Sequence, residues 1–505
     1  MNEIKIELSP SGAVLVVKAG SQLRDVLAPE YAEFACDGQS QCGSCRVQLI
    51  EGSLPVTPLD AEVLPSDELA AGWRLACQAV VSSPLRLRCQ HSNIAILGDS
   101  ENVKPGSRSG LGIAVDLGTT TLVAQLLELS TGKVLAERSA LNPQTKWGAD
   151  VMTRVRCALD GIDLTSVIRE FLGTMIGDLI GRRGSEVRDI VLVGNTVMHH
   201  LFSGITVGPL SHVPFASPES GEQRFSAQQL NWPFENCCVR FLACIGGFVG
   251  SDVLAGIHAV GLHQSESLGV LIDLGTNGEI AIGNRDRILC ASTAAGSAFE
   301  AGSIRMGMRA ATGAISRVLQ QNGHIHCEVI GGGIASGICG SGLVDAVAVV
   351  LDLGILDPSG RLCKGAKCFA LDGNGNVKLY QQDIRELQLA KGAVSAGVSL
   401  LLKHLGRTID EVGRVYLAGA FGNYVSPASA VRIGLLEMPV EKIFPSGNSA
   451  LRGAKMALVS GLDSGAKCIE HLELASDPDF QDTFVSRMGF PDKANRKDVQ
   501  LEFAI

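Results

Sequence analysis

The tetrapeptide Asp-Leu-Gly-Thr occurs twice in this chain, at residues 116–119 and again at 273–276. An apolar, strand-like run precedes and follows each copy, so each predicts a β-hairpin whose first strand ends in an acid. Glycine lets such a turn approach a phosphate, and the threonines add hydroxyl and N–H donors. Asp116 and Asp273 would hold Mg²⁺ through water and organise the attacking water as the catalytic pair. One copy alone could be an ordinary hairpin, but two copies predict related halves that face one cleft.

Two later segments extend this pattern. Residues 415–423 are an apolar run that ends in glycines, which predicts a buried strand able to pack closely against an adenine ring. Residues 447–454 open a predicted helix with small side chains, which would allow close contact between the halves. Asn195 and Thr196 lie at a predicted strand-to-helix turn, where backbone N–H groups can face an anion. The predicted nucleotide-binding residues are Gly118, Thr119, Thr120, Thr121, Asn195, Thr196, Gly275, Thr276, Asn277, Gly278, Gly419 and Gly422.

A cysteine-rich loop near the start of the chain sets a second constraint. Cys36, Cys42 and Cys45 have the spacing C-x5-C-x2-C among glycines and serines, and Cys77 follows. Four thiolates in such a loop can hold a 2Fe–2S cluster, and small neighbours let backbone N–H groups face its sulfur atoms. A structural zinc site is the alternative, but zinc sites usually pair two close C-x2-C elements and only one is present. Alternating apolar residues around the loop predict a compact module over residues 1–97.

Composition limits the classes of function. The chain has 505 residues, 59 of them glycine, and 46% of it is apolar, which suits two or more α/β-type domains. A net charge of −9 without a basic run argues against nucleic acid as a partner. We find no signal-peptide pattern and no apolar run of ~20 residues, so we expect no membrane partner and a cytoplasmic location. The fifteen cysteines are then expected to be reduced thiols or metal ligands.

Four motifs follow one another along the chain: the two Asp-Leu-Gly-Thr hairpins, the strand–Gly segment 415–423 and the small-residue helix 447–454. In this order they resemble the motifs of the superfamily of acetate kinase, sugar kinases, the seventy-kilodalton heat-shock chaperones and actin. The resemblance implies that the hairpins clamp ATP phosphates, the strand–Gly segment holds adenosine and the small-residue helices form a hinge. The context Arg-Leu-Ala-Cys-Gln around Cys77, with the cysteine spacing, resembles adrenodoxin-like ferredoxins. The expected fold class is an α+β β-grasp ferredoxin domain followed by a two-lobed α/β actin-like ATPase domain with duplicated ribonuclease H-like halves. The predicted ranges are 1–97 for the ferredoxin domain, 98–111 for a flexible Gly/Ser/Pro-rich linker, and 112–505 for the ATPase domain, with lobes at about 112–265 and 266–505.

Further short sequence segments resemble those of one family in particular, the reductive activators of corrinoid proteins. These segments are residues 142–144, 148–151, 193–200, 247–252, 291–296, 299–302, 337–343 and 385–391. This resemblance implies an ATP-hydrolysing corrinoid protein reductase, which transfers one electron from its 2Fe–2S cluster to an inactive Co(II) corrinoid protein and restores Co(I) for methyl transfer. The implied cofactors are the cluster, ATP and Mg²⁺. The implied partners are the corrinoid protein and an external low-potential electron donor, and a homodimer is compatible with the fold. O-demethylation, methylamine use and the acetyl-CoA pathway stay open as the methyl-donor system.

Two departures from the family pattern affect the electron path. Some members carry an extra domain between the ferredoxin and the first hairpin, where this chain has only the predicted linker. Others carry C-terminal 4Fe–4S cysteines, where this chain has only Cys468 beyond Lys467. We therefore expect a single cluster, which both receives the electron and passes it on.

Two other functions are compatible with the motifs. The first is a small-molecule kinase with an attached redox-sensing ferredoxin domain, and the second is a nucleotide-gated binding module. A kinase needs a phosphoryl acceptor, whereas an activator hydrolyses ATP only with its protein partner. Acids at both hairpins argue against the pure binding module, because binding alone would not need them.

Several conspicuous residues are expected to have ordinary structural roles. His199 and His200 are interpreted as core or cleft histidines rather than metal or corrinoid ligands. Arg305 and Arg309 could face phosphate or simply be solvated. Buried or surface thiols without a metal role are expected at Cys89, Cys237, Cys238 and Cys339.

Overall fold

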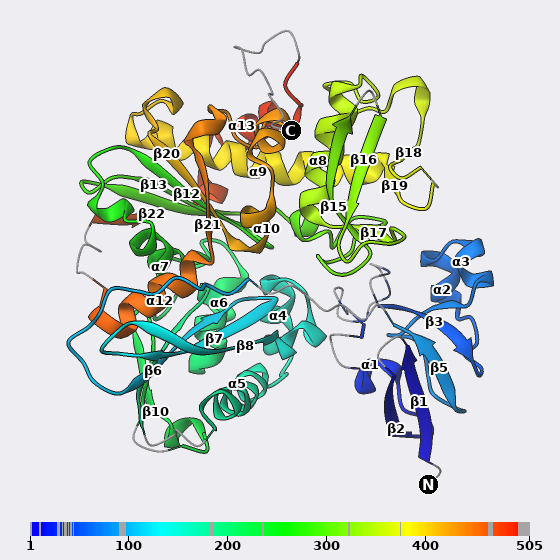
Figure 1. Ribbon diagram of the computed structural model, residues 1–505, viewed down its shortest axis with the longest axis horizontal. Helices are drawn as coiled ribbons and strands as arrows, with labels where there is room; N and C mark the ends of the chain where they lie inside the picture. The colour runs from blue at the N-terminus through cyan, green and yellow to red at the C-terminus, as the bar shows by residue number, and fades with distance from the viewer. Residues whose placement is uncertain are drawn as a thin grey trace.

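The computed structural model contains a small N-terminal sheet, a first lobe and a second lobe (Figure 1). It describes residues 3–9, 12–27, 31, 32, 34, 38, 40, 43, 45–89, 97–181, 186–234, 237–321, 324–373, 375–462 and 468–492. In Figure 1 the second lobe lies above the first, and the blue N-terminal sheet lies to the right of the first lobe. None of the helices in these ranges is long and apolar enough to cross a lipid bilayer.

The N-terminal sheet is a β-grasp. Its elements are β1 (Glu3–Ser9), β2 (Ala13–Lys18), α1 (Leu23–Val26), β3 (Arg46–Glu51), α2 (Pro58–Val63), α3 (Ser66–Ala70), β4 (Trp73–Leu75) and β5 (Leu85–Arg88). The strand order is β2-β1-β5-β3-β4, and β1 and β5 run parallel. Ile4, Ile6 and Leu8 of β1 are buried and the residues between them are exposed, which is the period of a half-buried strand. The predicted ferredoxin fold is confirmed by this order.

The two lobes repeat one sheet topology. The strands of the first lobe are β6 (Leu111–Leu117), β7 (Thr121–Glu128), β8 (Lys133–Leu141), β9 (Val187–Val193), β10 (Gln223–Ser226) and β11 (Cys238–Phe241). Those of the second are β12 (Gly269–Leu274), β13 (Gly278–Gly283), β14 (Ile288–Thr293), β20 (Arg414–Ala418), β21 (Ile443–Gly447) and β22 (Ile469–His471). The orders β11-β9-β6-β7-β8 and β21-β20-β12-β13-β14 match strand for strand. The predicted duplication into ribonuclease H-like halves is confirmed.

This topology brings the nucleotide motifs to one edge of each sheet. β6 pairs in parallel with β9, and β12 pairs in parallel with β20. Because parallel strands end at the same edge, the turns after all four strands gather there. Asp116 and Asp273 therefore lie at corresponding ends of the two central strands.

Helices α7 (Ser251–Ala259) and α12 (Ser449–Ser460) pack between the lobes. A Cβ atom on Gly453 of α12 would overlap the carbonyl oxygen of Ala255 in α7. A Cβ atom on Gly256 would lie 3.1 Å from the Ser449 hydroxyl oxygen. Small residues thus let the two helix backbones approach closely, as the sequence predicted for 447–454.

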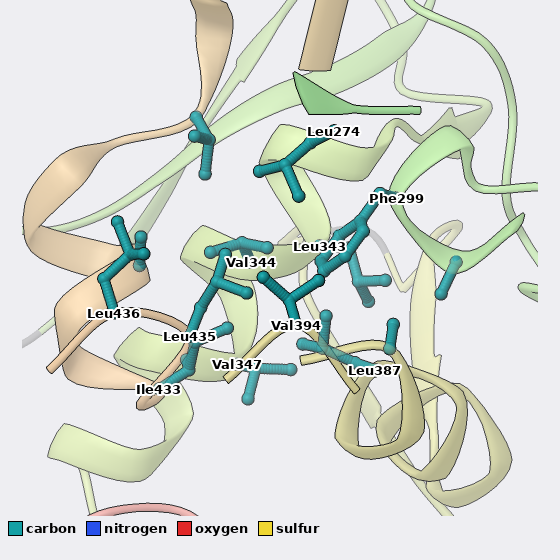
Figure 2. Close-up of a cluster of buried hydrophobic side chains, with 14 of the residues drawn as sticks. Leu274, Phe299, Leu343, Val344, Val347, Leu387, Val394, Ile433, Leu435 and Leu436 are labelled. Atoms are coloured by element: carbon teal, nitrogen blue, oxygen red, sulfur yellow. The ribbon is translucent and has the colours of Figure 1, made fainter. Parts of the chain in front are cut away.

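The remaining helices cover the sheets. In the first lobe they are α4 (Val151–Leu159), α5 (Leu164–Ile180) and α6 (Thr196–Ser203). In the second lobe they are α8 (Gly340–Asp352), α9 (Gln381–Leu405), α10 (Gly419–Tyr424), α11 (Pro427–Arg432) and α13 (Phe480–Met488). The core of the second lobe joins β12, α8, α9 and the segment after α11 (Figure 2). Leu274, which follows Asp273, and Phe299 both belong to this core, so they anchor the neighbouring polar residues.

The second lobe also carries two small sheets that the sequence did not predict. Their strands are β15 (Ala314–Gln321), β16 (His324–Val329), β17 (Gly337–Ile338), β18 (Cys368–Ala370) and β19 (Lys378–Tyr380). The first sheet has the order β16-β15-β17 and lies above the ferredoxin domain in Figure 1.

Residues 98–110, within the predicted linker 98–111, form no helix or strand but pack onto the first lobe and α12. Asp99 is buried, and its carboxylate pairs with Arg452 at 3.1 Å and with Lys455 at 3.0 Å. The Lys455 ammonium also donates to the carbonyl oxygens of Asp99 and Glu101. Burial lowers the pKa of Lys455 and the Asp99 charge opposes this, so the pair holds the segment in place. A flexible linker does not account for these contacts.

We expect Asp99→Ala to destabilise the protein by about 3–5 kcal/mol, because it leaves the fully buried Lys455 without its carboxylate. Glu101→Ala is the matched control, because the Glu101 side chain is 65% exposed and pairs with the same Arg452. We expect that control to cost about 0–1 kcal/mol. Denaturant unfolding of both variants measures the difference, and equal losses would contradict the role of the buried pair.

Candidate functional site

The first phosphate-type turn lies between β6 and β7. The Gly118 N–H donates to the Thr121 carbonyl at 3.1 Å, and a Cβ on Gly118 would lie 2.6 Å from that oxygen. Only glycine therefore fits this tight turn. The Asn142 side chain donates to the Gly118 carbonyl at 2.9 Å, and the Asn142 N–H donates to the Thr120 carbonyl. The turn is thus held from both sides.

Thr119 connects this turn to two other elements. The Asn195 side chain, at the N-cap of α6, donates to the Thr119 hydroxyl at 2.8 Å. The Arg154 guanidinium donates to the Thr119 carbonyl. Arg154 is fully buried, and burial lowers its pKa to about 9, so it stays a cation at neutral pH. Arg154 belongs to no predicted motif, although its spacing with Val151 and Val155 on α4 places it on the inward face.

The second turn, between β12 and β13, is similar. The Gly275 N–H donates to the Asn277 carbonyl at 3.0 Å, and the Gly278 carbonyl accepts from the Thr293 hydroxyl. The Asn277 side chain is hydrogen-bonded to Glu279. Both predicted turns are therefore present and internally fixed.

Glu300 joins the two turns. Its carboxylate accepts hydrogen bonds from the Thr276 hydroxyl at 2.9 Å and from the Thr120 hydroxyl at 3.5 Å. Glu300 ends the short helix η6 (Ser297–Glu300), and the preceding Phe299 is inserted in the core of the second lobe (Figure 2). The Phe299 ring stacks on Phe421 with centroids 4.7 Å apart. The structure therefore brings the predicted threonines of both lobes to one carboxylate that carried no predicted role.

Four acids lie near one another where the two lobes meet. Burial raises the pKa of Asp116 to about 6, although a hydrogen bond from the Asn448 side chain at 2.8 Å opposes the rise. Burial and the Asp116 charge raise the pKa of Asp273 to about 7. Burial and the Asp273 charge raise the pKa of Asp252, on α7, to about 8. Burial and the neighbouring aspartates raise the pKa of Glu279 well above its usual value.

These acids fit a divalent cation that keeps part of its water shell. Across the described ranges, no three His, Cys, Asp or Glu side chains stand close enough to bind a metal ion directly. Mg²⁺ usually takes one or two carboxylates plus waters and substrate phosphates, which agrees with such a loose group. A cation would also offset the burial of these carboxylates, which is the main cause of their raised pKa values, and the repulsion that adds to it for Asp252, Asp273 and Glu279. Asp252 and Glu279 were not predicted, although an acid in the apolar strand 278–283 is a usable signal.

The predicted adenosine-side residues lie at the end of β20. Gly419 has a φ of +79°, and a Cβ there would lie 2.5 Å from the Asp273 carboxylate. Gly422 is buried in α10 against Leu417. Thr196, by contrast, is fully buried and its hydroxyl donates to the Gly246 carbonyl at 2.7 Å. Thr196 therefore supports the β9–α6 turn, and its predicted role at phosphate stays a prediction.

The cluster-binding region is described in part. Cys36 and Cys42 lie outside the described residues, whereas Cys45 and Cys77 are described. Both thiols are buried, and their sulfur atoms are 3.3 Å apart, which fits two ligands of one small cluster. The Ser40 hydroxyl lies 3.4 Å from the Cys77 sulfur, and the Gln78 amide donates to it at 3.8 Å. Such hydrogen bonds to a ligand sulfur tune a cluster's potential.

The two adjacent histidines and the four cysteines predicted to have no metal role lie buried or half-buried, as expected for residues with structural roles. His199 and His200 are fully buried with Nδ1 atoms 3.3 Å apart, and burial lowers the pKa of both. Burial raises the pKa of Cys89 and Cys237 to about 12, so both stay thiols. The Cys339 thiol is buried beside the Ser341 hydroxyl, while Cys238 is half-buried.

Arg305 and Arg309 differ in position. The Arg305 guanidinium stacks on the Tyr380 ring at 4.4 Å, and the Arg305 N–H donates to Asp383. Arg309, like Glu300, lies close enough to Arg154 for its charge to affect the Arg154 pKa. Arg309 is therefore the arginine of this pair that borders the cleft.

Family models match the chain in three adjoining parts. They are described as a 2Fe-2S iron-sulfur cluster binding domain over residues 6–82, a RACo middle region over 111–265, and the C-terminal ASKHA domain of RACo over 267–500. A corrinoid activation enzyme, RamQ, of Eubacterium limosum is 34% identical over 75% of this chain and 70% of the relative. The chain belongs to the family of reductive activators of corrinoid proteins.

Two other relatives agree with this family. A reductase of a Co(II) methylated amine-specific corrinoid protein from Methanosarcina barkeri is 26% identical over 75% of this chain and 77% of the relative. A solved structure of a reductive activator for a corrinoid, iron-sulfur protein is 26% identical, has a TM-score of 0.66 and covers 97% of this chain and 98% of its own. The family membership supports a 2Fe–2S cluster in the first domain and a nucleotide in the cleft.

We expect Cys45→Ala to remove the cluster, with loss of its visible absorption and of iron per chain, because it removes one of the two predicted ligand thiols that lie side by side. Cys89→Ala is the matched control, since Cys89 is equally buried in the same domain but lies outside the predicted ligand spacing. The control should keep full iron content. A Cys45→Ala protein with an unchanged 2Fe–2S spectrum would contradict the ligand assignment.

A second prediction concerns Asp252. Because its pKa is raised in the folded protein, folding is favoured when Asp252 is protonated, and this contribution is lost as pH rises through about 8. Asp252→Asn should therefore raise the free energy of unfolding by roughly 1–3 kcal/mol near pH 8 and change it little near pH 4. Denaturant unfolding without nucleotide measures both values. Asp286→Asn, at an 80% exposed side chain, is the control, and an equal gain at both pH values would exclude charge as the cause.

Proposed function

We propose that this protein is an ATP-dependent reductive activator, which transfers one electron to an inactive Co(II) corrinoid protein and restores Co(I). The observation that carries the proposal is the short path between the two sites. Arg46, next to the ligand Cys45, donates to the Arg305 carbonyl at 3.1 Å. Arg305 is five positions from Glu300, which holds both phosphate-type turns. A ferredoxin domain that contacts the segment following Glu300 suits a reaction that couples electron transfer to the nucleotide.

The cleft residues would divide the work on the nucleotide. Thr119, Thr120 and Thr276 would donate to the phosphates, together with the N–H groups of the two glycine turns. Asp116 and Asp273 would hold Mg²⁺ through water and orient the attacking water, with Asp252 and Glu279 behind them. Arg154 would offset phosphate charge from beneath the first turn.

The ferredoxin residues would hold and tune the electron carrier. Cys36, Cys42, Cys45 and Cys77 would hold the 2Fe–2S cluster. When bound there and reduced by a low-potential donor, the cluster would supply the single electron that takes the partner's Co(II) to Co(I). Ser40 and Gln78 would adjust its potential through the Cys77 sulfur. Because Cys45 and Cys77 are buried, water has little access to this side of the cluster site.

Nucleotide is needed in this proposal because the electron must move uphill. Plant-type ferredoxins have potentials near about −400 mV, and Co(II) in a corrinoid protein is expected to be harder to reduce. A gap of ~100–200 mV for one electron corresponds to roughly 2–5 kcal/mol. Nucleotide can close it only by acting differently on two states. We propose that the nucleotide-bound form holds the corrinoid protein in a geometry that weakens an axial cobalt ligand.

Stopped-flow mixing of the reduced protein with a Co(II) corrinoid protein tests the proposal. The Co(I) absorption band should form faster and to a greater extent with MgATP than without it. ATP hydrolysis should also depend on the corrinoid protein. Asp273→Asn should keep the cluster spectrum and lose the ATP effect, because it removes a Mg²⁺-orienting carboxylate.

Equal rate and extent of Co(I) formation with and without ATP would contradict the proposal. Phosphorylation of a small molecule in the absence of any corrinoid protein would instead support the kinase. Nucleotide binding without hydrolysis, even with the partner present, would support a gated binding module.

A further inference from the structure

Glu300 occupies hydrogen-bond donors that a nucleotide phosphate would need. Its carboxylate accepts from Thr120 in the first lobe and from Thr276 in the second. A carboxylate and a phosphate are both anionic acceptors, so they compete for the same hydroxyl groups and repel each other. Glu300 also lies near the buried cation Arg154. Without nucleotide, this side chain therefore stands where a phosphate would bind and links the two lobes.

The ferredoxin domain spans the same two lobes. Arg46 donates to the Arg305 carbonyl in the second lobe at 3.1 Å. Asp25, after the start of α1, pairs with Lys146 of the first lobe at 3.8 Å. Arg305 is held on the second lobe by Tyr380 and Asp383, so the contact reports the position of that lobe. A large change in the spacing of the lobes would therefore break at least one of the two contacts.

We propose that nucleotide phosphate displaces Glu300 from the two threonines, and that the resulting change in lobe spacing releases the ferredoxin domain from its docked position. In the docked state the Cys45 end of the domain lies against the ATPase lobes, next to Arg305. Release exposes this end to a protein partner. The inference rests on the proposed function, because it needs nucleotide in the cleft, and it adds how nucleotide controls access to the cluster end.

The docking contacts are weak enough to be controlled in this way. The Asp25 side chain is 63% exposed and the Lys146 side chain is 28% exposed, so water and salt compete with the pair. The hydrogen bond from Arg46 is also exposed, and the Arg46 guanidinium keeps Glu68 as a second partner at 3.3 Å. Loss of both contacts therefore leaves no buried charge unpaired.

Zero-length carbodiimide cross-linking of the full holoprotein tests the release. The reagent joins a carboxylate to a nearby amine, and mass spectrometry identifies the linked peptides. The Asp25–Lys146 cross-link should form without nucleotide and fall by at least about threefold with a non-hydrolysable Mg·ATP analogue. The Lys403–Asp479 pair, which lies within the second lobe and has both side chains exposed, is the internal control and should not change.

Variants separate the two steps. In a titration with a fluorescent ATP analogue, Glu300→Gln should bind the analogue several-fold more tightly than the wild-type protein does, because the competing negative charge is gone. Glu128→Gln is its matched control, since Glu128 also accepts from a threonine hydroxyl, Thr131, but within an exposed turn. Arg46→Ala should lower the Asp25–Lys146 cross-link without nucleotide. Arg86→Ala, which removes an arginine paired with Glu51 in the same sheet, should not.

Each result decides between the two proposals. If the analogue binds and the Asp25–Lys146 cross-link is unchanged, the release is wrong while the proposed function stands. If Glu300→Gln binds the analogue less tightly, Glu300 supports the nucleotide rather than competing with it, and the inference is overturned. If no nucleotide binds to the wild-type protein, the inference and the proposed function fail together.

Discussion

The architecture depends on holding like charges together. Burial raises the pKa values of Asp116, Asp252, Asp273 and Glu279, and the charges of neighbouring acids raise those of the last three further, so without the surrounding fold these side chains would move apart into water. The two apolar sheets prevent this, because each central strand is buried over most of its length and carries its acid one residue before its end. The small residues of α7 and α12 then allow the lobes to approach closely enough for the acids to interact.

This arrangement makes the cleft sensitive to what enters it. A divalent cation with phosphates would relieve repulsion among the acids and claim the threonine hydroxyls that Glu300 now holds. The segment that carries Glu300 also carries Arg305, whose carbonyl oxygen accepts a hydrogen bond from Arg46 of the ferredoxin domain. Charge balance in the cleft and the position of the electron carrier are therefore parts of one connected structure rather than properties of two independent domains.

Local motifs could be predicted from the sequence, whereas most contacts between distant segments could not. The sequence predicted both Asp-Leu-Gly-Thr turns, the later strand in 415–423, the helix that begins in 447–454 and the β-grasp domain. Each of these depends on short-range backbone geometry. Glu300, Arg154 and Asn448 were missed as site residues. Each acts on a turn far away in the chain, and nothing in its own neighbourhood reveals that partner.

The predicted linker shows the same limit. Its Gly/Ser/Pro composition is typical of a flexible segment, but composition does not reveal that Asp99 meets Arg452 and Lys455 more than three hundred positions later. By itself, the sequence determined the duplicated halves and the pair of acids at the ends of their central strands, because repeats are encoded locally. The four cysteine ligands stay a prediction from their spacing. Only the tertiary structure decided that one carboxylate spans both phosphate turns and that the ferredoxin domain touches both lobes. Those contacts arise when packed elements bring together residues that no local pattern connects.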